Sequence, residues 1–213
     1  HQCNEDYTPV SFVQLEEDAG QIDLDRLEPS FMYSQIFKKI LLNMDHDAEA
    51  RQSLVKYCQE KFANNSSELR IIEDFRLHYV PDKAIWWYTR ECFTYHLLNR
   101  ALRTFDASMM VTMGVFIRDL HHRIQHLHAQ QHPSFPSQFV VYRGQGLLKT
   151  DFKKMKESRG GLLSFNNFLS TSQQRDISHN FAVRGSEKAD HVGVLFHITI
   201  DQSIKSSSFA LIK

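Results

Sequence analysis

Apolar residues recur at three- and four-residue steps through the first 130 positions, which is the spacing of helices that bury one face. The pattern predicts five helices, from Ser30 to Leu41, from a cap at Asp47 to Phe62, from a cap at Ser67 to Leu77, from Lys83 to about Thr104, and from about Ser108 to Ala129. Residues 1–29 are polar and acidic and are interpreted as a linker that contains one short strand, Val10–Val13.

The pattern changes after the proline-containing linker His132–Pro136, where extended apolar runs replace the helical spacing. Strands are predicted at Phe139–Tyr142, Leu162–Leu169 and Val192–Ile200, with short helices at Leu147–Lys156 and Asp176–Ala182. Because helices come first and strands follow, the order favours an α+β fold over alternating βαβ units. The expected domains are the linker 1–29, a helical lobe 30–130 and a β-rich core 131–213.

Composition narrows the classes of function. The 25 basic and 25 acidic side chains cancel, which argues against a nucleic-acid partner and against a polybasic membrane surface. No apolar run reaches the roughly 18 residues that a membrane span needs. Cys3, Cys58 and Cys92 have neither disulfide-framework nor zinc-finger spacing, which favours a reducing, intracellular compartment. His122 and His126 stand one helical turn apart, but no matching ligand completes a metal site.

Arg143 follows the predicted strand Phe139–Tyr142 and precedes Gly144-Gln145-Gly146. Glycines let a backbone approach a ligand closely, and a guanidinium at a strand end beside a glycine turn suits a phosphate or a carboxylate. The alternative is a surface arginine paired with an acidic neighbour.

Ser170-Thr171-Ser172 follows the apolar pair Phe168-Leu169. Three hydroxyls after a strand are common in turns and helix caps. Hydroxyls at a strand edge, together with the amide of Asn167, also match the hydrogen-bonding groups of a ribose. The segment alone leaves both interpretations open.

The two segments together form a more specific pattern. An aromatic-Arg-Gly tripeptide at Tyr142 is followed about 26 residues later by Phe-x-Ser-Thr-Ser, and then by Phe181 on the next predicted helix. This order resembles the arginine-serine-glutamate class of mono-ADP-ribosyltransferases. Upstream, the segments Ala84–Phe93 and Leu98–Arg103 are similar to the helical lobe of invertebrate members, some of which carry tetratricopeptide repeats. The resemblance covers roughly Phe31 to Lys213.

The resemblance implies a mixed β-sandwich core that binds NAD as a substrate, without a metal. Arg143 would hold the NAD diphosphate, next to Tyr142 in the same cradle. The backbone of Gly144 would pair with the nicotinamide carboxamide, and Ser170 would orient the catalytic glutamate. The expected reaction transfers ADP-ribose to a side chain of an acceptor protein, with arginine as the inherited expectation, and releases nicotinamide.

The remaining positions follow from the same resemblance. Thr171 and Ser172 would support the strand turn, and Asn167 is a candidate contact to the nicotinamide ribose. Phe181 is a candidate stacking partner for the nicotinamide ring. The alternative for Phe181 is a core residue on an amphipathic helix.

The family's catalytic carboxylate comes from a Glu-x-Glu or Gln-x-Glu motif on a later strand. The acids after Ser172 stand outside any such motif, and they are Asp176, Glu187, Asp190 and Asp201. We therefore expect the chain to be a fragment, truncated within the core, of a catalytic parent protein. The alternatives are a non-catalytic NAD-binding or protein-interaction module that keeps the fold, and a purely structural helical scaffold.

Overall fold

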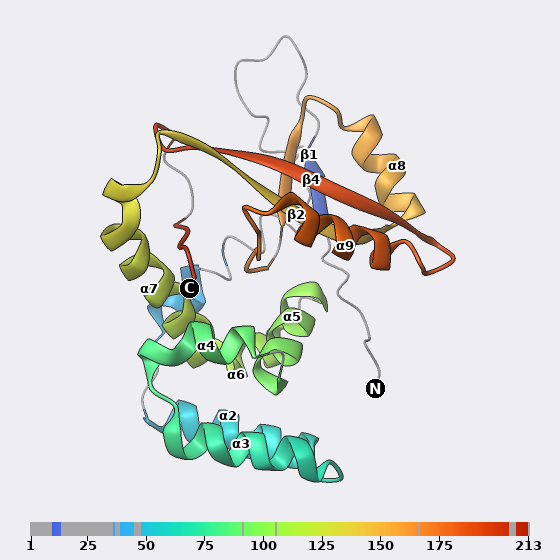
Figure 1. The fold of residues 1–213 in the computed structure, drawn as a ribbon. Helices are drawn as coiled ribbons and strands as arrows, with labels where there is room; N and C mark the ends of the chain where they lie inside the picture. The colour runs from blue at the N-terminus through green and yellow to red at the C-terminus, as the bar shows by residue number, and fades with distance from the viewer. Residues whose placement is uncertain are drawn as a thin grey trace. The chain divides into compact units, whose positions relative to one another are not determined.

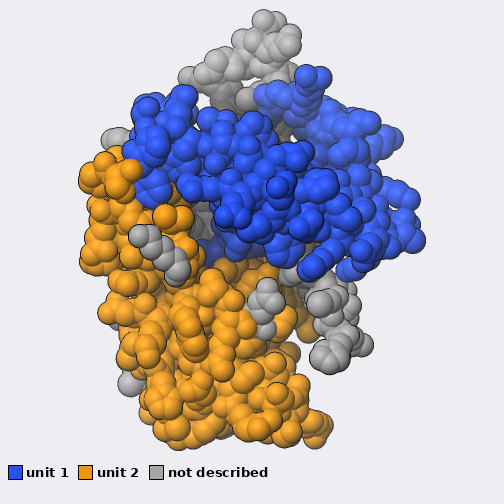
Figure 2. Space-filling model, in the orientation of Figure 1, with its two compact units in different colours: residues 1–34, 135–206 blue, residues 35–134, 207–213 orange. Residues whose placement is uncertain are grey.

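The computed structural model describes residues 10–13, 36, 39–44, 48–90, 92–104, 106–165, 167–204 and 208–212. The chain divides into two compact units (Figures 1 and 2), which we call the strand unit (residues 1–34 and 135–206) and the helical unit (residues 35–134 and 207–213). The units meet in sequence after Ser134, inside the predicted linker. The predicted cap Asp47, the predicted helix start at Ser30 and most of segment 1–29 lie outside the described residues.

The helical unit packs its helices around aromatic side chains. Its elements are α2 (Ala48–Lys61), α3 (Ser66–His78), η2 (Pro81–Lys83), α4 (Ala84–Thr89), α5 (Phe93–Thr104), α6 (Ala107–Thr112), α7 (Gly114–Gln131) and η3 (His132–Ser134). Phe75 lies at the centre of the core, with its ring 5.0 Å from Trp87 and 5.4 Å from Phe93. These three side chains are almost completely buried, so they supply much of the hydrophobic free energy of the unit.

The prediction of one helix from Lys83 to Thr104 is wrong, because the chain breaks between α4 and α5. The Thr94 hydroxyl donates to the carbonyl of Trp87 at 2.9 Å, and the Cys92 thiol lies 3.8 Å from the same oxygen. A carbonyl near the end of a helix needs a partner, and these side chains supply it. Trp87 and Phe93 are therefore both buried, although they lie on different helices.

The predicted fifth helix is also divided, into α6 and α7, with the break at Met113 and Gly114. Glycine has a low helix propensity, so little free energy is lost when the helix is interrupted there. Side-chain caps set two helix starts. Asp106 accepts from the amide of Met109 at 3.0 Å, and Asn65 accepts from the amide of Glu68 at 3.1 Å. The third helix thus begins at Ser66 with Asn65 as its cap, which corrects the predicted cap at Ser67.

The strand unit contains two antiparallel strand pairs (Figure 1). β2 (Gln138–Leu148) pairs with β4 (His191–Asp201) along its full length, with Arg143 opposite Phe196. β1 (Val10–Val13) pairs with β3 (Leu162–Phe165), which confirms the short strand predicted near the start of the chain. Phe165 and Phe196 bring the two pairs into contact, since their rings lie 5.3 Å apart.

Two helices complete the strand unit, α8 (Lys149–Glu157) and α9 (Arg175–Gly185). β2 is much longer than the predicted strand Phe139–Tyr142, and it ends at Leu148, so the helix predicted from Leu147 begins at Lys149. β3 ends at Phe165, although the predicted extended run continued to Leu169. The strand Val192–Ile200 and the helix Asp176–Ala182 are confirmed within β4 and α9.

Glycines allow α9 to lie directly on the ribbon formed by β2 and β4, as Figure 1 shows. A Cβ atom on Gly144 would lie 1.6 Å from the carbonyl oxygen of Ser178, and one on Gly146 would lie 2.5 Å from that of Gly185. A Cβ atom on Gly193 of β4 would lie 2.3 Å from the carbonyl oxygen of Ala182. The backbones of helix and ribbon are therefore in contact, which only residues without a side chain permit.

Candidate functional site

Arg143 lies in the middle of β2, which corrects the expectation of a strand end beside a glycine turn. Gly144 and Gly146 are strand residues, and their missing side chains are explained by the contact with α9. Successive side chains of a strand point to opposite faces. Gly144 faces α9, so Tyr142 lies on the same face of the ribbon and Arg143 on the opposite face.

The Arg143 side chain is half-buried and joins two parts of the strand unit. Its Nε donates to Oε1 of Gln145 at 2.9 Å, and its Nη1 donates to the backbone carbonyl of Ser170 at 2.9 Å. Gln145 has only 4% of its surface exposed. Arg143 is thus held in one orientation by a buried side chain on its own strand and by the Ser170–Ser172 segment.

That segment runs along the edge of β2 and touches it at one residue pair. The amide of Tyr142 donates to the carbonyl of Ser172 at 2.7 Å, and the amide of Ser172 donates to the carbonyl of Tyr142 at 2.9 Å. The Ser172 hydroxyl accepts from the amide of Gln174 at 3.0 Å, just before α9. Ser172 therefore fills the structural role of a turn hydroxyl, while Ser170 and Thr171 are exposed.

The edge of β2 opens beyond this bridge. In an antiparallel strand, alternate residues turn their N–H and C=O groups to the same edge, so those of Gly144 face the edge that Tyr142 uses. Continued pairing would place Gly144 opposite Ser170, but the isolated bridge at Tyr142 and Ser172 is the backbone pairing found there among the described residues. We call this opening, between Gly144 and Ser170 and spanned by the Arg143 side chain, the edge fork.

The other two predicted residues are Asn167 and Phe181. Asn167 is half-buried and stands between β3 and Ser170. Phe181 lies on α9 with 50% of its surface exposed, so its interpretation as a core residue is wrong. Ser178 and Ala182 are the buried residues of that helix. Since α9 covers the face opposite the Arg143 side chain, a ligand that touches both Phe181 and Arg143 must cross the edge of β2.

Three residues that shape the site were not assigned a role from the sequence. Gln145 orients Arg143. The Ser178 hydroxyl donates to the carbonyl of Tyr142 at 2.9 Å, and the His197 ring stacks on Tyr142 with centroids 5.3 Å apart. A period-two pattern along the strand would have placed Gln145 beside Arg143. The other two contacts join segments distant in sequence, for which a single sequence holds no local signal.

The late acidic residues of β4 and its preceding loop lie near the two ends of the ribbon. Asp201 is opposite Gln138, and its carboxylate accepts from the side chains of Gln138 and Ser203. Hydrogen bonds from Ser203 and then from Gln138 hold the pKa of Asp201 below its usual value. Arg143 is five strand positions from Gln138, a separation of about 17 Å along the ribbon. Asp201 is therefore too far to act on a ligand group at Arg143.

Glu187 and Asp190 precede β4 at the opposite end of the ribbon, where His191 pairs with Leu148. Leu148 is also five positions from Arg143, which again corresponds to about 17 Å. Asp176 is exposed in the first turn of α9 and is the late acid nearest in sequence to Ser172. Among the described residues, the carboxylates of Asp201, Glu187 and Asp190 therefore lie at the ends of the ribbon, away from the edge fork.

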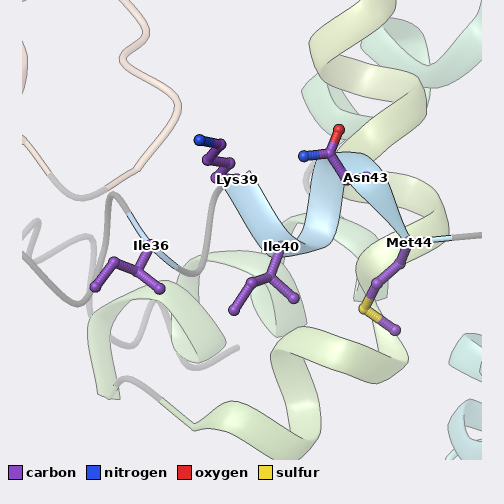
Figure 3. A pocket seen from close by; sticks show the side chains of 5 residues that line it. All are labelled: Ile36, Lys39, Ile40, Asn43 and Met44. Carbon is purple, nitrogen blue, oxygen red and sulfur yellow. The ribbon is translucent and has the colours of Figure 1, made fainter.

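Other features of the described residues bear on ligand classes. No group of three or more His, Cys, Asp or Glu side chains among them is arranged to hold a metal ion, and none of their helices combines the length and apolarity needed to cross a bilayer. Cys58 and Cys92 are free and buried. Figure 3 shows an open hollow of the helical unit. It is lined by Ile36, Lys39, Ile40, Asn43 and Met44.

Comparison with known proteins gave no match to a family model, to a curated protein or to a solved structure. The geometry of the edge fork and the sequence pattern around it therefore carry the functional argument. The structure brings Tyr142, Arg143, Gly144, Ser170 and Ser172 together, with Thr171 between the two serines.

Proposed function

We propose that this chain binds NAD at the edge fork and belongs to a mono-ADP-ribosyltransferase that modifies protein side chains, with arginine as the acceptor. The observation that carries the proposal is the bond from Arg143 to the Ser170 carbonyl beside the Tyr142–Ser172 bridge. It joins two sequence segments, about 26 residues apart, whose order resembles that enzyme class.

The chemistry of the edge fork suits a dinucleotide. A guanidinium offers five N–H donors in a planar arrangement that matches phosphate oxygens. The N–H and C=O of Gly144 face the opening, and this donor–acceptor pair complements the carbonyl oxygen and one N–H of a carboxamide. The exposed hydroxyls of Ser170 and Thr171 can bond ribose hydroxyls, as can the Asn167 amide.

Transfer of ADP-ribose requires one more group. The bond between nicotinamide and ribose breaks through an oxocarbenium-like state, which a nearby carboxylate stabilises. Nicotinamide leaves without strong acid assistance because it already carries positive charge. In the proposed mechanism the exposed Ser170 hydroxyl orients that carboxylate, Arg143 holds the diphosphate, and Gly144 holds the carboxamide that departs with the leaving group.

Titration of the full chain with NAD by calorimetry tests the binding step. We expect Arg143→Lys to lower the affinity by about tenfold or more, because lysine keeps the charge but loses the planar donors and the bond to Ser170. Arg159→Lys is the matched control, since Arg159 is an exposed arginine of the strand unit that lies before β3. Equal affinities for the wild type and Arg143→Lys would overturn the site assignment.

A second candidate function is NAD binding without transfer, and the placement of Asp201, Glu187 and Asp190 at the ends of the ribbon favours it for this chain. Incubation of the full-length protein with labelled NAD and agmatine, a free guanidine acceptor, separates the two. Labelled agmatine and released nicotinamide, both abolished by Ser170→Ala, would support the transferase. Saturable NAD binding with neither product would support the binding module.

A further inference from the structure

The last segment of the chain returns to the helical unit after the strand unit is complete. Residues 207–213 group with the helical unit, although they follow β4 in the sequence. In Figure 1 the described part of this segment, in red, lies beside α7. Two side chains near the end of that helix, His128 and Gln131, bind it.

These side chains bind the main chain of the segment. Nε2 of Gln131 donates to the Leu211 carbonyl at 3.0 Å, and Oε1 of Gln131 accepts from the Leu211 amide at 2.8 Å. Nδ1 of His128 donates to the Phe209 carbonyl at 3.0 Å, and the two rings meet edge to face with centroids 4.6 Å apart. The glutamine amide, with a donor and an acceptor, thus satisfies both backbone groups of Leu211. We call His128, Gln131, Phe209 and Leu211 the clasp.

Apolar burial contributes little to the outer part of the segment. Leu211 has 44% of its surface exposed and Ile212 has 56%, while Phe209 is half-buried. Each hydrogen bond of the clasp contributes only about 1 kcal/mol. Contacts as few as these stay closed only if the rest of the chain keeps the segment near α7.

One end of the ribbon brings together the chain that leaves α7 and the chain that returns to it. Gln138 is opposite Asp201 in the pair of β2 and β4. Beyond that pair, the amide of Gln202 donates to the Ser137 carbonyl at 3.0 Å, and the Gln202 side chain donates to the Phe135 carbonyl at 2.9 Å. The outgoing and returning chains are therefore bonded to each other before the clasp is reached.

We propose that the clasp is a conformational device that couples the two units: it closes when this end of the ribbon is paired, and it stabilises that pairing in return. The inference goes beyond the proposed function and does not rest on the binding of NAD. It assigns a role to α7 and to the last described residues, which the sequence pattern left without one.

Loop length sets the size of the coupling. When the ribbon is unpaired, closing the clasp joins Gln131 to Leu211 across 80 positions of sequence. When Gln138 is paired with Asp201, seven positions from Gln131 to Gln138 and ten from Asp201 to Leu211 complete the path. The probability of closing a loop falls with about the three-halves power of its length, so pairing of the ribbon favours the clasp by about tenfold. Since coupling is reciprocal, the closed clasp favours the pairing by the same factor.

Amide hydrogen exchange, followed by NMR in the full chain, tests the coupling from both sides. Gln131→Leu removes both bonds to Leu211, so we expect the Leu211 amide to lose its protection and the distant Gln202 amide to exchange a few fold to about tenfold faster. Gln202→Leu loosens the ribbon end, so we expect faster exchange of the Leu211 amide by a similar factor, although Gln131 is intact. Gln130→Leu, at an exposed neighbouring position of α7, is the matched control and should change neither amide.

The opposite end of the ribbon supplies an internal reference. There the amide of Lys149 donates to the Asp190 carbonyl at 2.9 Å, and its exchange should be the same in all variants. Equal acceleration at Lys149 and Gln202 in Gln131→Leu would show a general loss of stability and would overturn the proposal. The nuclear Overhauser contact between the rings of His128 and Phe209 is a second readout, and we expect Gln131→Leu to weaken it.

The remaining outcomes are equally decisive. If the Leu211 amide exchanges as fast in the wild type as in Gln131→Leu, the clasp is open in solution. If Gln131→Leu leaves the Gln202 amide unchanged, or Gln202→Leu leaves the Leu211 amide unchanged, the segment binds α7 independently of the ribbon, and the coupling is refuted. Thermal unfolding shows whether each variant is folded. If Gln202→Leu does not fold, the Gln202 amide in Gln131→Leu decides the question.

Discussion

Replacement of Gly144 by alanine would place a methyl group inside the contact between β2 and α9. The new Cβ would lie 1.6 Å from the Ser178 carbonyl oxygen and 2.7 Å from the backbone nitrogen of Ala182. Both atoms belong to the backbone of a helix, so neither can rotate away as a flexible side chain would. The helix must withdraw as a unit.

The size of the effect follows from that geometry. To reach even a 3.0 Å contact, the Ser178 oxygen must move by about 1.4 Å. Overpacking of this kind costs about 1–3 kcal/mol. The shift would also strain the 2.9 Å bond from the Ser178 hydroxyl to the Tyr142 carbonyl, which contributes about 1 kcal/mol. We expect a total destabilisation of α9 against the ribbon of about 3 kcal/mol.

Hydrogen exchange measures this loss locally. A destabilisation of about 3 kcal/mol accelerates exchange through local opening by about two orders of magnitude, and the effect should be confined to α9, Arg175–Gly185, and the adjoining strands. Fluorescence of Trp86 and Trp87, which lie in the helical unit, should remain unchanged in the folded protein. That signal separates a local change from global unfolding.

Gly160 supplies the matched control. Its φ is +85°, and a Cβ atom added there would have no other atom within 4 Å, so Gly160→Ala costs only the strain of a left-handed backbone, about 1–2 kcal/mol. It should leave exchange in α9 unchanged. If Gly144→Ala accelerates exchange in α9 no more than Gly160→Ala does, α9 does not rest on β2 at Gly144. If it abolishes NAD binding alone, the glycine serves the ligand and not the helix.

Three further predictions concern side chains outside the edge fork. Burial raises the pKa of the Cys58 thiol to about 12, so a disulfide reagent at about pH 8 should modify Cys58 only after unfolding, as peptide mass spectrometry can show. Tyr79→Phe should destabilise the helical unit by about 1.5–3 kcal/mol in urea unfolding, because the buried Asp119 carboxylate loses the hydroxyl that donates to it at 2.9 Å. Because hydrogen bonds lower the pKa of Asp201 below 3.8, its contribution to stability is present above that pH and is lost as the pH falls below it. Ser203→Ala should raise that pKa in a carboxyl NMR titration.

Each of these predictions has an outcome that contradicts it. Rapid labelling of Cys58 in the folded protein would show that α2, which carries this buried side chain, separates readily from the rest of the helical unit. Tyr57→Phe is the control for Tyr79, since the Tyr57 hydroxyl only accepts a 3.4 Å bond from the exposed Lys61, and equal effects of the two variants would refute the role of Asp119. An Asp201 pKa that stays constant in Ser203→Ala would show that the bond between them is absent in solution.

The sequence predicted where helices occur better than where they break. Periodicity predicted the helical residues of α4 and α5, but it could not foresee that the Thr94 hydroxyl would bond the Trp87 carbonyl and end α4. A threonine at such a position fits both a continuous helix and a break. The choice depends on burying Trp87 and Phe93 together, which is a tertiary property.

The sequence pattern grouped the Arg143 and Ser170 segments, but it did not predict how they are arranged. The structure places the two segments side by side, because Nη1 of Arg143 donates to the Ser170 carbonyl and the backbones of Tyr142 and Ser172 pair. The glycines were interpreted as a turn because glycine is common in turns, whereas here they lie in a strand under a helix. Only the position of α9 shows whether the glycines form a turn or lie in a strand under a helix. That helix begins about 30 positions later in the chain.

The tetrapeptide Arg143-Gly144-Gln145-Gly146 is best understood as two interleaved pairs. One face of β2 carries the glycines, which let α9 lie on the backbone, and the other face carries Arg143 and Gln145, which are bonded to each other. Successive side chains of a strand point to opposite faces, so one strand can carry both pairs only if the glycines alternate with Arg143 and Gln145. The packing of α9 then limits positions 144 and 146 to glycine, whereas positions 143 and 145 lie on the face that the helix does not cover. The same packing holds the backbone of Gly144 in place at the edge fork, so the contact that stabilises the fold also orients the groups that would meet NAD.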